Sequence, residues 1–459
     1  MTRHVRIGSA LVACALLLAA CTESPSEVTA PQDLAATVAP RHSDGQYFVR
    51  YNAAFPPRSL STTIAQAGGT VVHDFAPIGF MVVRGLTQAA AQRLGARGDI
   101  LGVAPDYAMQ WIPREPLRLA QKRRTTNKSK LATDQSSAFF FDDQWNLRNV
   151  GVPIAWRETK AGAGALVCVL DTGIDPGQLD LVGKVDISRS TSFVPSEPFI
   201  EDLNAHGTFI AALISSNGIG IGSVAPEAKL CAVKVLDFTG LGNFSAVVAG
   251  LFHSALVGAD VANLSLTAYV PKTLPGVDLL RDVLRFAVQH VRELGVSVIA
   301  AAGNDGINLD TDGDNIVLPA ETPRVISVAA NAPFAQMNFD ALASYSNFGG
   351  VLGGVDITAP GGDFLPGGNP LDLILSACSR FVCGGDGFYV LGSGTSFASP
   401  HVAAVAALTE SVLPGNQTAD ELDGCLLRNA MVIRDTSGAR DNRYGVGRLH
   451  AVRAGLCLR

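Results

Sequence analysis

The chain has 459 residues, of which 47% are hydrophobic and 17% are charged. This composition is typical of globular α/β proteins and excludes a largely disordered chain. The formal net charge of −6 is small, so nothing in the charge balance indicates nucleic acid as a partner. The length allows two or three domains.

The first 21 residues have the pattern of an export signal. Arg3 and Arg6 precede an apolar run over 7–20, which is too short for a permanent transmembrane helix. The run ends in two alanines followed by Cys21, similar to a bacterial lipobox, in which the cysteine carries lipid. The sequence therefore predicts export, either as a lipoprotein of the cell envelope or, if Cys21 is incidental, as a secreted protein.

A small domain is predicted after a flexible tether over 22–44, which is rich in Ser, Thr, Pro and Ala. The domain covers 45–111. Its strands are expected over 47–51, 70–75, 80–83 and 100–105, and its helices over 60–67 and 87–94. The order β-α-β-β-α-β is that of a ferredoxin-like α+β domain.

Residues 112–140 change character and are predicted to be a linker. Basic residues are concentrated there and apolar residues are few; the basic residues are Arg114, Arg118, Lys122, Arg123, Arg124, Lys128 and Lys130. Such a run is typically solvated, and it offers exposed sites for proteolytic processing.

Residues 141–459 read as one larger α/β domain. Strands are expected over 165–170, 229–236, 261–266, 296–300 and 325–329, with helices over 209–214, 244–256 and 279–294 between them. Alternating strands and helices predict a parallel sheet with helices on both faces. The ligand site of such a sheet lies at the carboxyl ends of its strands, where Asp171 and Asn304 fall.

Six cysteines remain after the predicted signal, in a setting that permits disulfides. One pair lies close together among glycines and could close a small loop, one pair lies in the C-terminal region, and one pair lies in strand-like runs where buried thiols are expected. Sequence alone leaves the pairing open. The three pairs are Cys378 and Cys383, Cys425 and Cys457, and Cys168 and Cys231.

Small residues surround the hydroxyl of Ser396 in the stretch 392–401. Gly392 and Gly394 allow a tight turn, and the apolar run over 402–408 predicts a buried helix that begins near Ser396. The free N–H groups and the dipole of a helix N-terminus favour developing negative charge, as nucleophilic acyl transfer requires. The alternative is a serine that merely caps the helix.

Three further motifs supply the other groups that a serine nucleophile needs. Asp171-Thr172-Gly173 follows a buried strand, His206 begins a predicted helix, and the run 301–304 ends in Asn304. Each alone could be a turn or helix-start residue. Their joint occurrence at element ends favours a base, a group that orients the base, and a side-chain amide for an oxyanion.

These motifs resemble the three signatures and the oxyanion segment of the subtilases, the subtilisin-like serine peptidases. The resemblance implies a subtilisin-like fold, with Ser396 as nucleophile, His206 as general base and acid, Asp171 as the group that orients His206, and Asn304 as oxyanion donor. It also implies that 45–111 is an inhibitory propeptide, which acts as an intramolecular inhibitor. Phe209 replaces a frequent second histidine, which has no part in proton transfer.

The resemblance extends to two substrate-binding edges and a calcium site. The backbone of Ser265, Leu266 and Thr267 and of Ala301, Ala302 and Gly303 is implied to bind peptide substrates as an added strand. Thr267 stands where many members have glycine, so the preferred side chain stays open. The implied structural calcium ligands are Asp180, Asn217, Ile219 and Ile221. The acidic loop 310–315 is a second candidate, with a solvated turn as its alternative.

The sequence thus predicts an exported, self-processed serine endopeptidase that acts on peptides or proteins. Two other functions use the same features. A silent binding protein on this fold would be expected to lack a catalytic residue or the oxyanion amide, and none of the four is missing. An acyl-transferring ligase or cyclase would use the same residues and differ only in its products.

Overall fold

The computed structural model describes residues 40–112, 118–119, 135–350, 354–413, 415 and 417–457. The predicted signal, the possible lipid site at Cys21, most of the tether and most of the basic linker lie outside the described residues. None of the helices in the described part of the chain has the length and apolar character needed to cross a bilayer.

The N-terminal domain is a βαββαβ unit, as predicted. Its elements are β1 (Arg41–Tyr51), α1 (Leu60–Gln66), β2 (Thr70–Phe75), β3 (Phe80–Arg84), α2 (Gln88–Gly95) and β4 (Ile100–Gln110). The strands form an antiparallel sheet in the order β2-β3-β1-β4, which confirms the ferredoxin-like arrangement. β1 and β4 extend beyond the predicted strands because their added ends pair with each other, Arg41 opposite Ala108.

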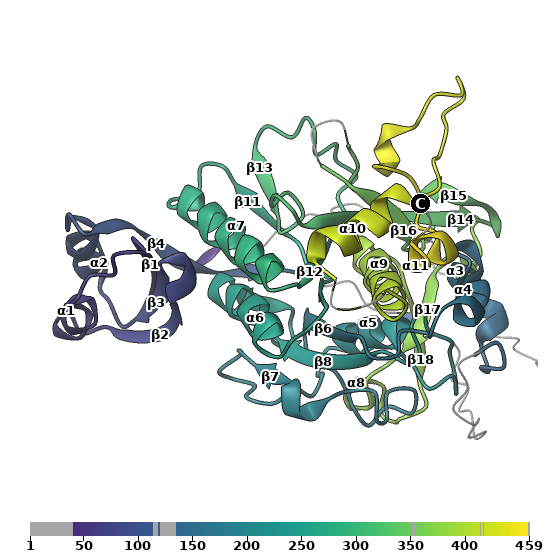
Figure 1. The fold of residues 1–459 in the computed structure, drawn as a ribbon, viewed down its shortest axis with the longest axis horizontal. Coiled ribbons are helices and arrows are strands. Elements are labelled where there is room, and N and C mark those ends of the chain that lie inside the picture. Colours follow the sequence, from purple (N-terminus) through teal and green to yellow (C-terminus); the bar gives the residue numbers. More distant parts are fainter. Residues whose placement is uncertain are drawn as a thin grey trace, which may run out of the picture. The chain divides into compact units, whose positions relative to one another are not determined.

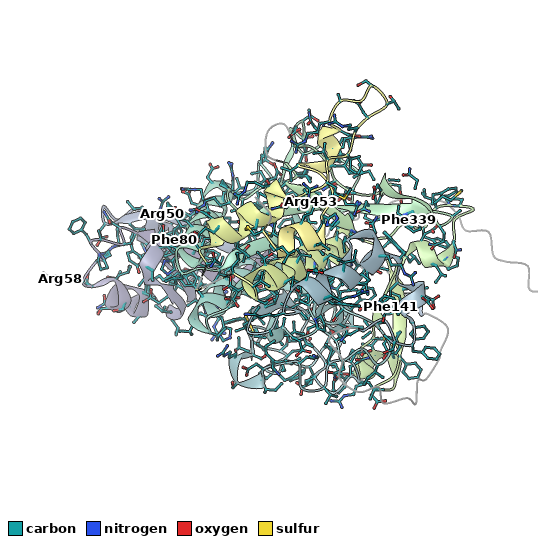
Figure 2. The ribbon with its side chains drawn as sticks, turned by 45° about the vertical axis from the view of Figure 1, so that its right-hand side comes forward. Arg50, Arg58, Phe80, Phe141, Phe339 and Arg453 are labelled. Carbon is teal, nitrogen blue, oxygen red and sulfur yellow. A yellow bond between two sulfur atoms is a disulfide. The ribbon has the colours of Figure 1, made fainter. Side chains whose placement is uncertain are left out.

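Both faces of this sheet are buried. Tyr47 and Val49 pack with apolar side chains of α1 and α2, whereas Phe48 joins an apolar core that α6 (Phe244–Leu256) and α7 (Val277–Glu293) of the larger domain share. On the same face the Arg50 guanidinium lies over the rings of Phe80 and Phe286 at 5.6 and 5.2 Å (Figure 2). The run 47–51 is therefore apolar except for Arg50, because both of its faces are covered.

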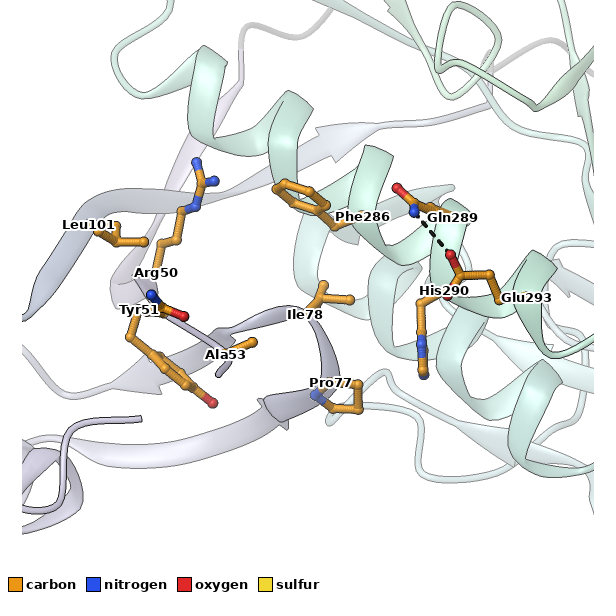
Figure 3. Close-up of a pocket in the computed structure, with 11 residues that line it drawn as sticks. Arg50, Tyr51, Ala53, Pro77, Ile78, Leu101, Phe286, Gln289, His290 and Glu293 are labelled. Carbon is orange, nitrogen blue, oxygen red and sulfur yellow. Dashed lines mark hydrogen bonds between the residues drawn. The ribbon is translucent and has the colours of Figure 1, made fainter. Parts of the chain in front are cut away.

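A cavity of about 450 Å³ lies along part of this contact (Figure 3). Arg50, Tyr51 and Ile78 line one side, and residues of α7 line the other. Gln289 and Glu293 of α7 are joined there by a hydrogen bond of 2.9 Å. The lining includes none of the four predicted catalytic residues, so the cavity is separate from the predicted catalytic site.

The larger domain is built on a mainly parallel sheet, as predicted (Figure 1). Its strand order is β15-β14-β12-β10-β6-β8-β7, and β16 pairs with β14. Every pair is parallel except β14 with β15. The strands are β6 (Leu166–Asp171), β7 (Thr191–Ser192), β8 (Lys229–Lys234), β10 (Val261–Leu264), β12 (Ser297–Ala301), β14 (Ile326–Phe334), β15 (Met337–Leu342) and β16 (Ile357–Pro360).

Helices cover both faces of this sheet. On β6, Val167 and Val169 belong to the core that contains α5 (His206–Ile214) and α9 (Thr395–Glu410), whereas Leu166, Cys168 and Leu170 belong to the core that contains α6 and α7. This alternation explains the continuous apolar run of the strand and confirms the predicted architecture.

The remaining elements border this core. They are β5 (Arg118–Leu119), α3 (Trp145–Asn149), α4 (Val152–Glu158), β9 (Leu241–Asn243), β11 (Ala268–Pro271), β13 (Asn315–Leu318), β17 (Ile374–Ala377), α8 (Arg380–Cys383), β18 (Tyr389–Gly392), α10 (Ala419–Arg428) and α11 (Ala451–Gly455). β9 adds to the N-terminal sheet beside β4, and β5 pairs with β18.

Three disulfides join the six cysteines. Cys378 pairs with Cys383, as the small-loop interpretation suggested, and Cys425 pairs with Cys457. Cys168 pairs with Cys231, so the expectation of buried thiols is wrong at these two positions. The reason is strand order: β6 and β8 are neighbours, and the two cysteines lie opposite each other on the same face.

Candidate active site

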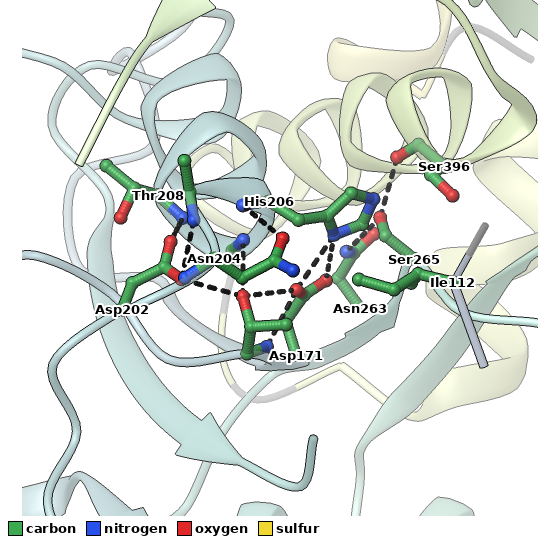
Figure 4. Close-up of polar contacts among 12 residues, drawn as sticks. Ile112, Asp171, Asp202, Asn204, His206, Thr208, Asn263, Ser265 and Ser396 are labelled. Carbon is green, nitrogen blue, oxygen red and sulfur yellow. Dashed lines mark hydrogen bonds and ion pairs between the residues drawn. The ribbon is translucent and has the colours of Figure 1, made fainter. Parts of the chain in front are cut away.

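The Asp171–His206 pair joins a strand end to a helix start (Figure 4). Asp171 is the last residue of β6 and His206 the first of α5. His206 Nδ1 lies 2.8 Å from Asp171 Oδ1 and 3.0 Å from Oδ2. Because an ionised carboxylate only accepts hydrogen bonds, Nδ1 carries the proton and Nε2 is left as the basic nitrogen. Burial is the largest single effect and disfavours the imidazolium, but the charge and hydrogen bond of Asp171 and the charge of Asp202 together outweigh it, and the pKa of His206 is raised.

A second buried carboxylate, Asp202, organises both members of the pair. Asp202 Oδ1 accepts the hydroxyl of Thr172 at 2.8 Å, and Oδ2 accepts the N–H of Thr208 at 2.8 Å. Thr172 Oγ1 in turn accepts the N–H of Gly207 at 3.0 Å. The residue after Asp171 and the first turn of α5 are thus held by one network. Burial raises the pKa of Asp202, and its charge adds to the Asp171 effect on His206.

Ser396 is the second residue of α9. The N-cap is Gly394, so Ser396 is in the first turn and the interpretation of Ser396 as a capping serine is wrong. Its carbonyl accepts the Ser265 hydroxyl at 2.7 Å, which fixes the start of the helix. Within the described residues, no hydrogen bond joins Ser396 Oγ to His206. Catalytic hydrogen bonds of this kind often tighten only when substrate is bound.

Asn304 follows β12 and faces the start of α9. Asn304 Oδ1 accepts both the N–H and the hydroxyl of Thr395 at 2.8 Å. Thr395 Oγ1 also accepts the N–H of Gly303 at 3.0 Å. With the oxygen anchored in this way, the orientation of the amide is set and Nδ2 is left as its donor.

The backbone groups of the two predicted substrate edges have different hydrogen-bond partners. The N–H of Thr267 donates to the carbonyl of Trp111 at 2.7 Å, so the edge of Ser265, Leu266 and Thr267 already makes a backbone hydrogen bond to the end of the N-terminal domain. The other edge has internal partners: Thr267 Oγ1 donates to the Ala301 carbonyl at 3.1 Å. The carbonyls of Ala302 and Gly303 accept the side chain and the N–H of Asn347.

The four predicted calcium ligands have protein partners. Asp180 Oδ1 accepts the N–H of Ile219 at 2.7 Å, and Oδ2 accepts the N–H groups of Gly220 and Ile221 and the hydroxyl of Tyr389 at 2.9, 3.2 and 2.7 Å. Asn217 donates to two backbone carbonyls at 2.9 and 3.1 Å.

These contacts do not suit a cation. Three N–H groups point their positive ends at the Asp180 carboxylate, where a calcium ion would have to bind. The carbonyls of Ile219 and Ile221 accept the Phe139 N–H and the Ser216 hydroxyl. In the described part of the chain, including the acidic loop 310–315, no group of three or more His, Cys, Asp or Glu side chains is arranged to hold a metal ion. As arranged here, the predicted ligands do not fit calcium.

Several residues of the site were missed from the sequence. Thr395 and Thr172 stand inside motifs that were recognised, and Asp202 lies four residues before His206, so their neighbourhood was the available signal. Lys234 had no such signal. It is fully buried at the end of β8, donates to the Thr172 carbonyl and pairs with Glu197 at 2.7 Å.

Comparison with known proteins identifies the family. The sequence model of the subtilase family matches residues 162–447, which include Asp171, His206, Asn304 and Ser396. The chain belongs to the subtilase family. It is therefore a subtilisin-like serine peptidase by descent and by fold.

Curated subtilases resemble the chain over most of its length. Alkaline elastase YaB of Bacillus sp. (strain YaB) is 33% identical over 410 residues, which are 86% of this chain and 94% of the relative. Subtilisin Savinase of Lederbergia lenta is 33% identical over 67% of this chain and 96% of its own length. The chain spans less of two other relatives, 63% of the thermophilic serine proteinase of Bacillus sp. (strain AK1) and 42% of the minor extracellular protease Epr of Bacillus subtilis.

Solved structures agree on the fold. The epidermin leader peptide processing serine protease of Staphylococcus aureus superposes with a TM-score of 0.70 at 21% identity, over 90% of this chain and 98% of that chain. A protease of Pseudoalteromonas arctica superposes with a TM-score of 0.57 at 26% identity, over 71% of this subtilase and 99% of that chain.

Proposed function

We propose that this subtilase is an exported serine endopeptidase that hydrolyses peptide bonds through an acyl-enzyme on Ser396. The observation that carries the proposal is the Asp171–His206 hydrogen bond of 2.8 Å, set beside the first turn of α9. It leaves His206 with a basic nitrogen and a raised pKa, as a general base requires.

The proposed chemistry follows from these positions. Ser396 Oγ attacks the scissile carbonyl carbon while His206 Nε2 takes the hydroxyl proton. The oxygen of the tetrahedral intermediate receives hydrogen bonds from Asn304 Nδ2 and from the Ser396 N–H. His206 then gives the proton to the leaving amine, the C–N bond breaks, and water hydrolyses the acyl-enzyme by the reverse sequence of proton transfers.

The second part of the proposal is that 45–111 inhibits the enzyme until it is removed. Trp111 supports it: its N–H donates to the Gly240 carbonyl at 3.1 Å, its carbonyl accepts the Thr267 N–H at 2.7 Å, and its indole N–H donates to the Gly242 carbonyl at 2.9 Å. These hydrogen bonds at a predicted substrate edge support the proposal, because an inhibitor that binds there would occupy the place of a substrate strand. Ile112, the next residue, lies among the labelled residues of the site in Figure 4.

Asp106 adds a second anchor for the same domain. Its carboxylate accepts the N–H and the hydroxyl of Ser245 at 3.1 and 2.6 Å and the Gln46 amide at 2.6 Å. Ser245 lies in the first turn of α6, where a carboxylate satisfies free N–H groups and complements the helix dipole. An intramolecular inhibitor docked in this way would block the cleft in the precursor.

The processing bond is proposed to lie between Ile112 and Arg118. Ile112 follows the residue held at the substrate edge, and Arg118 and Leu119 pair with β18, the strand that leads to Ser396. The chain thus meets the catalytic domain on both sides of this interval. N-terminal sequencing of the mature enzyme tests it, and a first residue before Ile112 or after Arg118 would contradict it.

Export and anchoring are also proposals. The three disulfides suit an oxidising compartment, and one relative is named as an extracellular protease. Mass analysis of the mature N-terminus in wild type and Cys21→Ala tests the lipid anchor. The proposal does not include a calcium ion at Asp180.

The test of the catalytic proposal compares wild type with Ser396→Ala. Wild type should remove its propeptide and cut a denatured protein, and the variant should do neither. Ser411→Ala, which removes a hydroxyl at the other end of α9, serves as the matched control and should behave as wild type. Equal behaviour of wild type and Ser396→Ala would overturn the role of Ser396: activity in both would place the reaction at other residues, and inactivity in both would indicate a binding protein. Joined rather than hydrolysed products in mass spectrometry would indicate a ligase.

A further inference from the structure

Tyr269 of β11 reaches the segment that carries Asn304. Its hydroxyl accepts the backbone N–H of Asn304 at 3.0 Å and the side-chain amide of Asn347 at 2.9 Å. These two donors use both lone pairs of the hydroxyl.

Asn347 holds the same segment from the other direction. Its amide nitrogen also donates to the Ala302 carbonyl at 2.9 Å. Its amide oxygen accepts the N–H groups of Asp305 and Ile307 at 3.1 and 3.2 Å. Tyr269 and Asn347 together thus contact the backbone on both sides of Asn304.

The contact between this segment and Tyr269 is close. A Cβ atom at Gly303 would lie 2.3 Å from the Tyr269 hydroxyl and 2.4 Å from the Asn347 amide nitrogen, so the backbone rests directly on these groups. Burial and the Asp305 charge raise the pKa of Tyr269, so the hydroxyl keeps its proton.

We propose that Tyr269, supported by Asn347, is a positioning residue for the oxyanion donor Asn304. The proposal rests on the role of Asn304 put forward above. Asn304 is held at two points: Thr395 binds its side-chain oxygen, and Tyr269 binds its backbone N–H. Tyr269 bonds to neither Ser396 nor His206, so it acts on the reaction only by setting where the Asn304 amide points.

The test is a double-mutant cycle of Tyr269→Phe and Asn304→Ala, with steady-state hydrolysis of a peptide substrate. Asn304→Ala should lower kcat by about 10²–10³, a value taken from the corresponding donor of a subtilisin. Tyr269→Phe keeps the ring and removes the hydroxyl. It should lower kcat about tenfold, the worth of one hydrogen bond, with KM little changed because the oxyanion forms only in the transition state. The double variant should be no slower than Asn304→Ala, because without the amide there is nothing left to position.

Controls separate this role from a general loss of structure. Tyr444→Phe removes the hydroxyl of another buried tyrosine and should leave kcat unchanged. Rates are measured well below the unfolding midpoint of each variant. Asn347→Ala, placed in the same cycle, should also lose its effect without Asn304, and it carries the test if Tyr269→Phe does not fold.

The outcomes distinguish the two proposals. If Asn304→Ala keeps the wild-type kcat, the oxyanion role of Asn304 is wrong. If Asn304→Ala is slow but Tyr269→Phe is not, or if the two losses multiply, the oxyanion role stands and the positioning role of Tyr269 is overturned. A rise in KM with unchanged kcat would also overturn it, because that result would place Tyr269 in substrate binding.

Discussion

Removing the Cys168–Cys231 bridge should cost much more stability than removing the Cys378–Cys383 bridge. The first closes a sequence separation of 63 residues and the second a separation of 5. The loop-entropy relation for the unfolded chain converts these separations into about 4 and about 2 kcal/mol at 25 °C. Cys168 and Cys231 are also fully buried, so the replacement has to conserve volume.

The experiment uses Cys168→Val with Cys231→Ala, which approximately keeps the combined side-chain volume, and Cys378→Ala with Cys383→Ala for comparison. Both pairs are made in a Ser396→Ala background, so that self-digestion does not interfere. Urea unfolding followed by tryptophan fluorescence should show a free energy of unfolding about 2 kcal/mol lower for the first pair than for the second. Equal losses, or a larger loss for the second pair, would refute the reasoning from loop length.

Three further predictions concern other parts of the molecule. Burial lowers the pKa of His401 from 6.5 to about 4, so the folded state favours the neutral imidazole. This contributes about 3 kcal/mol to the free energy of unfolding, which is fully present above pH 6.5 and is lost as the pH falls through 4. His401→Asn should flatten the pH profile of the unfolding free energy over this range. Chelation with EDTA should leave the thermal midpoint of the mature enzyme unchanged, and a midpoint that rises with added calcium would contradict this. Tyr389→Phe removes a hydrogen bond to buried Asp180 and should lower the unfolding free energy by about 2 kcal/mol. Asp106→Ala removes the carboxylate that binds the first turn of α6 and should weaken propeptide docking by about 2 kcal/mol. Activity should then appear earlier after processing, and an unchanged time course would contradict the role of Asp106 as an anchor.

Local pattern was sufficient for several elements, including the start of one that carries the site. The helix over 244–256 and the strand over 70–75 were predicted with the bounds that the structure has, because apolar periodicity and flanking turn residues mark both ends. The start of α5 at His206 was predicted in the same way. Strand ends were less predictable: β4 runs to Gln110 because β1 and β9 offer it partners, and a partner strand leaves no mark in the local pattern.

The predicted calcium ligands are a case in which the resemblance to the family was not sufficient to predict the site. Asp180 and Asn217 stand at the positions that the resemblance implies, yet the Asp180 carboxylate is occupied by N–H groups and by Tyr389. Tyr389 lies 209 residues further along the chain, so nothing near Asp180 indicated this partner.

The sequence by itself determined the family, the parallel sheet covered on both faces, and which aspartate, histidine, serine and asparagine carry the proposed chemistry. These features depend on short motifs and on periodicity, which are local properties of the chain. The tertiary structure decided the Cys168–Cys231 bridge, the docking of Trp111 against Thr267, and the hydroxyl of Tyr269 under Asn304. Each of these joins residues far apart in the chain, and such pairs form only where strand order and packing bring their elements together.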